Sequence, residues 1–340
     1  MADVENVIVI GSGPAGYTAA LYTSRANLKP LVIEGFAWGG LLQQTTDVEN
    51  YPGFPEGIMG PEMMQKLRDQ AARFGARLLN VQADRVELAN ELGGVHGVWV
   101  GDTEHRARTV ILAMGAEHKK LCIPGEDALG GRGVSYCATC DAAFFRDAQT
   151  VIVGGGDSAM EEAIFLSKFA KKVTIVHRRA EFRASKIMLE RAQAQENIEF
   201  LTPYTVSSFE PGKNGALGHA MLANTETGEQ RELQISGAFI AIGHEPQSAL
   251  VAGQVEVDEN GYVQVDGRST RTNRPGVFAA GDLVDHTYRQ AVTAAGSGCQ
   301  AALDAEWYLR DTPEVPTPEG MPVGDLAEAQ WVPVQATAEA

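Results

Sequence analysis

Two copies of one local pattern constrain the fold of this chain more than any other feature. In each copy a short apolar strand runs into a glycine-rich turn, and a segment with helical spacing follows; strand and turn occupy residues 7–16 and 151–159. A strand, a G-x-G-x-x-G/A turn and a helix are typical of dinucleotide-binding units, because the glycines let the backbone approach a pyrophosphate. The sequence therefore predicts an α/β protein with two Rossmann-like, three-layer domains.

Both copies continue in the same order, which indicates an internal repeat. A second strand follows each helix, then come short strands, and an apolar strand ending in Ala-x-Gly closes the copy. Beyond them, an apolar strand at 276–282 ends in an acid, and a helix of small residues runs from 289 to about 309. In the first copy we predict helices at 17–25 and 61–74, a strand at 30–33, several short strands within 77–112 and the closing strand at 110–115. In the second copy we predict a helix at 160–170, a strand at 173–176, several short strands within 198–235 and the closing strand at 239–243.

The residues that end the second strand of each copy differ in charge. Glu34 ends the first, whereas His177, Arg178 and Arg179 follow the second, with Arg183 four residues later. A carboxylate at this position suits a ribose diol, as in NAD or FAD, whereas arginines accept a 2′-phosphate. The basic cluster is informative because 44 acidic against 28 basic residues give the chain a formal charge of −16. We expect NADPH at the second turn; a solvated basic patch is the alternative.

Between the two turns lies a pair of cysteines, Cys137 and Cys140, separated by two residues. Such a pair is either redox-active or half of a zinc site. The other cysteines, Cys122 and Cys299, are isolated, so a four-ligand zinc site lacks its second pair. The pattern favours a redox dithiol and no metal site. Cys122 and Cys299 are expected to be small buried side chains.

Asp141 follows the second cysteine directly. A carboxyl group at this place is suited to give and take the proton of a leaving thiolate. The plainer interpretation is that Asp141 caps a helix beginning near Ala142. The two roles are compatible.

Composition limits the partners and the location. The negative charge argues against a nucleic-acid or anionic-membrane partner, and no apolar run approaches membrane-spanning length. The start is acidic, without a basic region or a separate apolar segment, so we expect no secretory signal and a cytoplasmic location. From Thr312 onward there are five prolines and no lysine or arginine, which predicts a poorly ordered tail over 314–340.

Taken together, these motifs resemble those of the low-molecular-weight, bacterial-type thioredoxin reductases, class II pyridine nucleotide-disulfide oxidoreductases. The resemblance covers about residues 5–310, and its most specific part is the pentapeptide at 137–141. Its other carriers are the segments 11–16, 49–53, 154–159, 177–179, 183–184, 276–282 and 289–291.

The resemblance implies an architecture and an activity. Residues 1–117 and 247–313 would form an FAD domain, into which an NADPH domain of residues 118–246 is inserted. Electrons would pass from NADPH through FAD to the Cys137–Cys140 disulfide and on to oxidised thioredoxin. Cys140 would receive the electrons and Cys137 would attack the partner. Family members are homodimers, so a homodimer is expected here.

The resemblance also implies site residues. The catalytic set is Cys137, Cys140 and Asp141. The FAD set is Gly11, Ser12, Gly13, Pro14, Ala15, Gly16, Glu34, Gly40, Leu41, Gln43, Asn50, Gly281, Asp282, Arg289, Gln290 and Ala291. The NADPH set is Gly154, Gly156, Asp157, Ser158, Ala159, His177, Arg178, Arg179 and Arg183.

Two positions depart from the family pattern. Leu41 stands where members often have glutamine, so a polar contact near the flavin is either missing or supplied by Gln43. Met114 replaces the threonine of the common Ala-Thr-Gly.

The predicted arrangement raises a geometric problem, because a nicotinamide and a disulfide on one inserted domain would compete for the same flavin face. Rotation of that domain about its crossings, near Glu117 and Glu245, is the expected solution.

Three other functions compete with this interpretation. An NADPH–ferredoxin or flavodoxin reductase of the same architecture needs no C-x-x-C. A peroxiredoxin-reducing flavoprotein normally carries an extra N-terminal redox domain, whereas this chain starts at its first strand. A non-catalytic NADPH- or redox-sensing protein would use the dithiol as a switch or a zinc clip, and tightly bound zinc without disulfide turnover would favour it.

Overall fold

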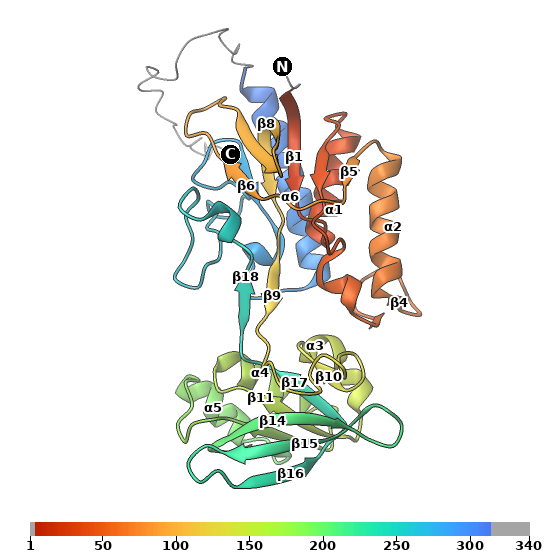
Figure 1. Cartoon of the computed structure of the whole chain (residues 1–340), viewed down its shortest axis with the longest axis vertical. Helices are drawn as coiled ribbons and strands as arrows, with labels where there is room; N and C mark the ends of the chain where they lie inside the picture. The colour runs from red at the N-terminus through yellow and green to blue at the C-terminus, as the bar shows by residue number, and fades with distance from the viewer. Residues whose placement is uncertain (1–3, 314–340) are drawn as a thin grey trace, which may run out of the picture. The chain divides into compact units, whose positions relative to one another are not determined.

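The computed structural model describes residues 4–313, which divide between two compact units. Unit 1 comprises Met1–Asp47, Tyr51–Ala116 and Pro246–Ala340, and unit 2 comprises Val48–Asn50 and Glu117–Glu245. The chain passes between them along two paired strands, β9 (Ala116–His118) and β18 (His244–Pro246) (Figure 1). The predicted α/β architecture, with one dinucleotide-binding unit inserted into another, is confirmed.

Unit 1 is built on a seven-stranded sheet in which the apolar run of the first motif is central. Strand β1 pairs in parallel with β2 and β8, and β2 pairs in parallel with β5. Strand β19 continues the parallel part beside β8, whereas β7 and β6 are antiparallel. The bounds are β1 (Val4–Ile10), β2 (Leu31–Ile33), β5 (Arg77–Leu79), β6 (Arg85–Glu87), β7 (His96–Val100), β8 (Thr103–Leu112) and β19 (Val277–Ala279).

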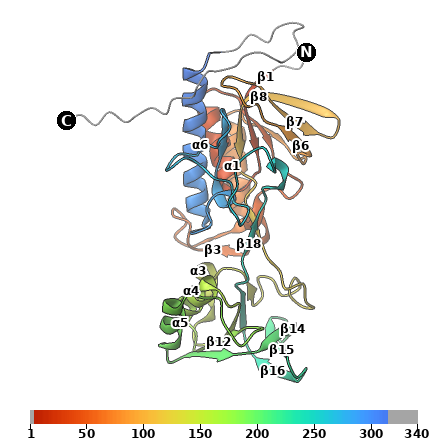
Figure 2. The same ribbon diagram turned by 90° about the vertical axis from the view of Figure 1, so that its left-hand side faces the viewer.

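The β1 run is buried on both faces of this sheet. Val7 and Val9 pack into one apolar cluster and Ile8 and Ile10 into another, as the period of two requires. Helices α1 (Pro14–Arg25) and α6 (Ala291–Asp311) cover the first face (Figure 2). The two helices can approach closely because residue 298 of α6 is glycine. A Cβ at this position would lie 2.2 Å from the Ala15 carbonyl oxygen of α1.

Shorter elements complete unit 1. Helix α2 is amphipathic and packs against α1 and the loop after β2. That loop forms a 3₁₀ turn and a small two-stranded sheet, so the predicted glycine-rich loop is partly ordered. The bounds are α2 (Gly60–Arg73), η1 (Gly40–Gln44), β3 (Asp47–Val48), β4 (Ile58–Met59), η3 (Ala249–Val251) and η4 (Gly281–Leu283).

Unit 2 repeats the plan with a five-stranded parallel sheet in the order β10-β17-β11-β12-β13. A separate antiparallel sheet, β14-β15-β16, follows. The strands are β10 (Val134–Ser135), β11 (Gln149–Val153), β12 (Lys172–Val176), β13 (Ile198–Leu201), β14 (Tyr204–Pro211), β15 (Leu217–Asn224), β16 (Gln230–Gln234) and β17 (Gly237–Ile240). The helical segments are α3 (Ala138–Asp141), η2 (Ala142–Phe145), α4 (Asp157–Leu166) and α5 (Lys186–Gln193).

Several predicted boundaries were wrong. Helices α1 and α4 begin three residues earlier than the patterns predicted, directly after Gly13 and Gly156, which act as extended N-caps. Strand β19 ends at Ala279, so Asp282 lies in the 3₁₀ turn η4 and not at the strand's end. Helix α5 was missed. The tail predicted for 314–340 lies outside the described residues.

The prediction that Cys122 and Cys299 are buried was also wrong. Cys122 is exposed, in a loop where its φ is +58°, and Cys299 is only partly covered on α6. The Cys299 thiol bonds to the Tyr22 hydroxyl and raises the pKa of that phenol. Cysteine type alone does not fix burial, because loops and outward helix positions accept it.

Among residues 4–313, no helix combines the length and the hydropathy that a bilayer crossing requires. The predicted lack of a membrane partner therefore rests on the charge argument.

A buried histidine in unit 1 leads to a testable pH dependence of stability. His96 is fully buried, and its Nδ1 accepts the Ala89 N–H. Its Nε2 has no hydrogen-bond partner among residues 4–313. Burial lowers the pKa of His96 from 6.5 to about 4. Between these values the unfolded chain binds a proton that the native imidazole refuses, so the free energy of unfolding should fall by about 3 kcal/mol as pH falls through this window.

Urea unfolding of the FAD-loaded protein between pH 4 and 8 measures this loss. His96→Gln should flatten the decline below pH 6.5, whereas His105→Gln, at a half-buried site on β8, should leave it unchanged. Parallel curves for the protein and His96→Gln would contradict the assignment.

Candidate functional site

The first glycine turn, residues 11–16, is shaped by backbone contacts that only glycine allows. Gly11 has φ +106°, and a Cβ there would lie 2.2 Å from the Ala113 carbonyl oxygen. A Cβ on Gly16 would lie 2.1 Å from the Gly11 carbonyl oxygen. In contrast, no heavy atom lies within 4 Å of a Cβ built on Gly13. The turn is closed against the protein and open at Gly13, as a dinucleotide cradle requires.

Two distant segments are brought to this turn within unit 1. Gly40 lies against Gly13, because its Cβ would be 3.4 Å from the Gly13 Cα. Gly281 lies against Ala15, whose Cβ would be 2.9 Å from a Cβ on Gly281. The structure therefore groups η1 and η4 with the predicted cradle. Leu41 and Gln43 are part of η1, and Asp282 follows Gly281 in η4.

Within the described part of the chain, two polar atoms at this cluster are buried without a hydrogen-bond partner: Asp282 Oδ1 and Gln43 Oε1. Burial is the main cause that raises the pKa of Asp282 to about 6; Asp285 adds to it and Arg289 opposes it. Orphaned polar atoms of this kind are uncommon unless a ligand or water completes them. They fit the polar chain of a flavin dinucleotide. Whether Gln43 supplies the polar contact that Leu41 lacks stays a prediction.

Glu34, the predicted ribose ligand, is already paired with an arginine within unit 1, which the sequence did not predict. Its side chain is fully buried; Oε1 accepts from the Tyr17 hydroxyl and from Arg68 Nε, both at 2.7 Å, and Oε2 accepts from Arg68 Nη2 at 3.0 Å. The Arg68 guanidinium also lies 5.5 Å from the Trp38 ring centroid. Contact between Glu34 and a ribose would have to share this ion pair, so that role stays a prediction.

The remaining predicted FAD residues occupy three places. The Ser12 hydroxyl donates to the Glu34 carbonyl oxygen and accepts from the Gly39 N–H, so only the Ser12 backbone can face a pyrophosphate. Asn50 belongs to the short stretch grouped with unit 2. Pro14 opens α1, and the triplet Arg289, Gln290 and Ala291 leads into α6, with Gln290 as the N-cap in a capping box.

The second turn, residues 154–159, is joined to a loop that lies about thirty residues away in sequence. The N–H groups of Arg183 and Ala184 both donate to the Gly155 carbonyl oxygen, at 2.8 and 3.0 Å. The Ser185 N–H donates to Asp157 Oδ1. These bonds bring Arg183 next to the predicted NADPH turn, near Arg178 and Arg179, which follow β12 and are exposed.

His177 packs directly under this turn. A Cβ on Gly155 would lie 2.3 Å from His177 Nδ1, so a larger residue there would displace the ring. The ring stacks on Phe182 with centroids 5.1 Å apart, and its Nε2 is buried without a partner. Burial, with the charges of Arg178 and Arg179 among the further causes, lowers the pKa of His177. A neutral imidazole nitrogen beside three arginines fits a phosphate-binding corner.

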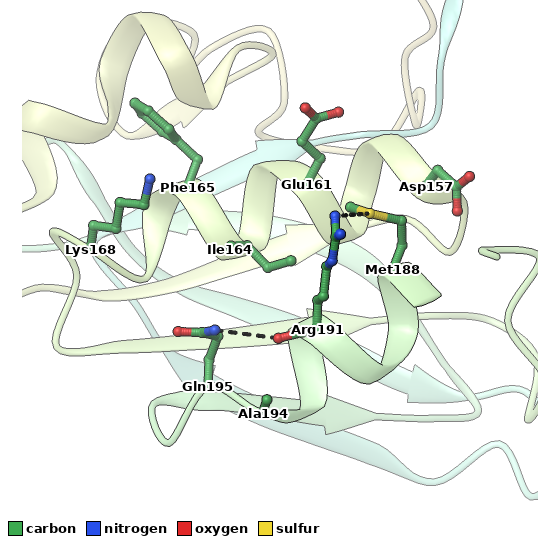
Figure 3. A pocket seen from close by; sticks show the side chains of 9 residues that line it. All are labelled: Asp157, Glu161, Ile164, Phe165, Lys168, Met188, Arg191, Ala194 and Gln195. Carbon is green, nitrogen blue, oxygen red and sulfur yellow. Dashed lines mark hydrogen bonds between the residues drawn. The ribbon is translucent and has the colours of Figure 1, made fainter. Parts of the chain in front are cut away.

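A groove between α4 and α5 lies on the same unit (Figure 3). Apolar side chains from both helices, among them Ile164 and Met188, line it, with Glu161 and Arg191 at its sides. Of the predicted NADPH residues it includes only Asp157. The groove is therefore distinct from the predicted phosphate-binding corner at His177, Arg178, Arg179 and Arg183.

The dithiol is closed. Cys137 and Cys140 form a disulfide with Cα atoms 5.3 Å apart, and the helix α3 begins directly after Cys137. Cys140 is exposed and Cys137 is half-buried. Since both cysteines are bonded to each other, the dithiol is not used as a zinc ligand in this state, and residues 4–313 contain no group of three or more metal-binding side chains.

Asp141 does not cap a helix. As the residue before η2 it makes no side-chain capping bond, so that interpretation was wrong. Its Oδ2 instead accepts from the Ser135 hydroxyl at 2.6 Å. Burial raises the pKa of Asp141, and the Ser135 bond partly opposes this rise. A partly buried carboxyl with a raised pKa keeps its proton more readily than an exposed one, which suits it to proton transfer.

Sequence reasoning missed Ser135 and Glu162. Ser135 precedes the dithiol by two residues in the two-residue strand β10, which no pattern predicted. Glu162, on α4, accepts the Ala138 N–H at 3.3 Å and thereby places a carboxylate at the dithiol segment. The adjacency of α3 and α4 depends on packing and has no local sequence signal.

Comparisons with known proteins show the family and its relatives. A family model described as pyridine nucleotide-disulphide oxidoreductase matches residues 5–298. The chain is 61% identical over 308 residues to the thioredoxin reductase of Mycolicibacterium smegmatis, which covers 91% of this chain and 97% of that protein. It is 57% identical over 308 residues to the bifunctional thioredoxin reductase/thioredoxin of Mycobacterium leprae, covering 91% of this chain and 66% of that protein. The thioredoxin reductase structure from Streptococcus pyogenes matches with a TM-score of 0.85 at 40% identity, covering 91% of this chain and 99% of that one.

Proposed function

The chain belongs to the pyridine nucleotide-disulphide oxidoreductase family, and from this membership we propose that it is an NADPH-dependent thioredoxin-disulfide reductase. The observation that carries the proposal is the Cys137–Cys140 disulfide, followed by the partly buried carboxyl of Asp141. Both lie on the unit that also holds Arg178, Arg179 and Arg183. A ferredoxin-type reductase would need no such disulfide. Thioredoxin is proposed as the substrate because the relatives are named thioredoxin reductases. One relative is named as a bifunctional thioredoxin reductase and thioredoxin.

Two cofactors are proposed, and the residues present fit both. The open face at Gly13 with the unpartnered oxygens of Asp282 and Gln43 would hold FAD. The open face at Gly156, with His177 and the arginines beyond it, would hold NADPH through its pyrophosphate and 2′-phosphate. When bound, FAD would accept a hydride from NADPH and supply two electrons to the disulfide.

The chain's own residues then act on sulfur and protons. Two electrons break the Cys137–Cys140 bond, with Cys140 as the sulfur that receives them. Cys137 attacks one sulfur of the thioredoxin disulfide and forms a mixed disulfide, which Cys140 resolves. Asp141 gives a proton to the Cys137 thiolate as it leaves Cys140, and it takes that proton back when Cys137 attacks thioredoxin. No role for nucleic acid or membrane is proposed, and a cytoplasmic location stays a prediction.

A titration tests the function directly. The purified protein is expected to be yellow, to bleach on addition of NADPH, and to regain colour only when oxidised thioredoxin is added. Colour that returns equally with a ferredoxin or flavodoxin as acceptor, but not with thioredoxin, would contradict the proposal.

A homodimer is proposed as well, on the basis of an apolar stripe on unit 1. Leu303 and Trp307 lie one turn apart on α6 and are 39% and 42% exposed, and Tyr22 of the adjacent α1 is 42% exposed. Exposed apolar side chains of this size on two packed helices are typical of an association surface. A second copy of the chain is the proposed occupant because the family implied by the sequence is dimeric.

Trp307→Glu should therefore shift the protein from dimer to monomer mass in sedimentation at micromolar concentration, since a carboxylate would be buried unpaired in the interface. Val257→Glu places the same charge at another site on unit 1 that is 40% exposed, and should leave the mass unchanged. A monomeric native protein, or a Trp307→Glu dimer, would contradict this surface.

A further inference from the structure

Ser135 connects the nucleophile and the proton donor within unit 2. Its hydroxyl donates to Asp141 Oδ2 at 2.6 Å and accepts the Cys137 N–H at 3.1 Å. A serine hydroxyl has one proton to donate, and the shorter contact with the carboxylate takes it. The side chain is 7% exposed, so water does not replace these bonds easily.

The setting of Asp141 makes that single donor important. Asp141 is partly buried, which favours its protonated form, and the hydrogen bond from Ser135 opposes that effect. The titratable groups on the elements that pack here are Glu162 from α4, Tyr136 after β10, and the two cysteines once reduced. Glu162 and a newly formed thiolate are both negative, so neither offsets the effect of burial.

We propose that Ser135 is a positioning residue that fixes the Asp141 carboxyl at the dithiol and limits how tightly this carboxyl keeps its proton. The inference rests on the proposed function. Reduction of the disulfide consumes two electrons, which NADPH supplies, and breaks the S–S bond into a thiol and a thiolate or two thiols. The proton for the departing sulfur comes from Asp141, and Asp141 must lose it readily in each cycle.

Removing the hydroxyl should raise the titration midpoint of Asp141. Because the hydroxyl stabilises the ionised carboxylate, its loss should move the midpoint upward by about one pH unit, which is about a tenfold change in the ratio of protonated to ionised carboxyl. Ser135→Ala should show this upward shift, and Ser135→Thr, which keeps the hydroxyl, should restore the original midpoint. Ser135→Gly provides a second deletion if the alanine variant fails to fold.

The readout is the infrared band of the protonated carboxyl in the FAD-loaded protein, followed from pH 4 to 9 and assigned by its loss in Asp141→Asn. Ser208→Ala is the matched control, because the Ser208 hydroxyl also donates to a carboxylate, that of Glu210 at 2.8 Å, on β14. Ser208→Ala should leave the midpoint unchanged.

The carboxyl titration and the thioredoxin-reduction assay test the role of Ser135 and the proposed function independently. The band measures Asp141 without thioredoxin, so it tests Ser135 even if thioredoxin is not the substrate. A tenfold change in the ratio of protonated to ionised Asp141 at fixed pH is the expected result. An unchanged or lowered midpoint in both Ser135→Ala and Ser135→Gly would overturn the inference, as would a rise that Ser135→Thr fails to reverse.

Discussion

Cys140→Ser is expected to abolish thioredoxin reduction while FAD and NADPH still bind. Serine cannot form the disulfide with Cys137, so two electrons find no sulfur bond to break, and the loss of turnover should be about 10³-fold or more. The dinucleotide turns, residues 11–16 and 154–159, do not include either cysteine, so the flavin spectrum and its bleaching by NADPH should persist. Steady-state thioredoxin reduction and the flavin spectrum measure the two effects.

Cys122→Ser is the matched control, because this exposed thiol is outside the disulfide. It should leave turnover unchanged. Normal thioredoxin reduction by Cys140→Ser would remove the dithiol from the mechanism. Loss of flavin from Cys140→Ser would show that the change acts through folding.

Arg178→Ala combined with Arg179→Ala is expected to weaken NADPH much more than NADH. Both arginines are exposed after β12, at the place where a 2′-phosphate is read. At about 1.5–3 kcal/mol for each charge-assisted bond, two arginines should account for about 10²-fold or more in affinity. Fluorescence titration with each nucleotide measures the ratio.

Arg231→Ala with Lys213→Ala removes the same net charge from unit 2 away from the turn and should change neither affinity by more than about twofold. Arg183→Ala should add to the NADPH effect, since the loop that carries it is bonded to Gly155. Equal losses for the two nucleotides would show that the arginines do not recognise the phosphate.

Local sequence patterns predicted the two dinucleotide units well because the constraint is itself local. The β-branched run before Gly11 can only be a buried strand. Only glycine fits at Gly11 and Gly16, because a Cβ would lie 2.2 and 2.1 Å from a carbonyl oxygen there. The same holds at Gly154, where a Cβ would meet the Ala241 carbonyl oxygen at 2.4 Å. The disulfide and the arginine cluster were predictable for a similar reason: their chemistry is carried by adjacent residues.

What could not be predicted depends on residues that meet only after folding. The partner of Glu34 is Arg68, which lies on α2, and no spacing rule connects the two. Ser135 reaches Asp141 because α3 turns the chain back toward β10. Cys122 is exposed although its residue type is usually buried, because the Leu121–Ile123 backbone is directed by bonds to Glu126. The roles of the site residues themselves stay predictions.

The pairing of β9 with β18 has a consequence for how such a chain can be assembled. The inserted segment Glu117–Glu245 begins and ends on the paired strands β9 and β18. For unit 1, the insertion is therefore equivalent to a long loop whose two ends are held together, as in a β-hairpin. Loop-closure entropy grows only with the logarithm of loop length, so a long insertion adds little to the cost of a short one. Once β9 and β18 hold the two ends together, the length of the insertion has almost no effect on the stability of the unit 1 sheet.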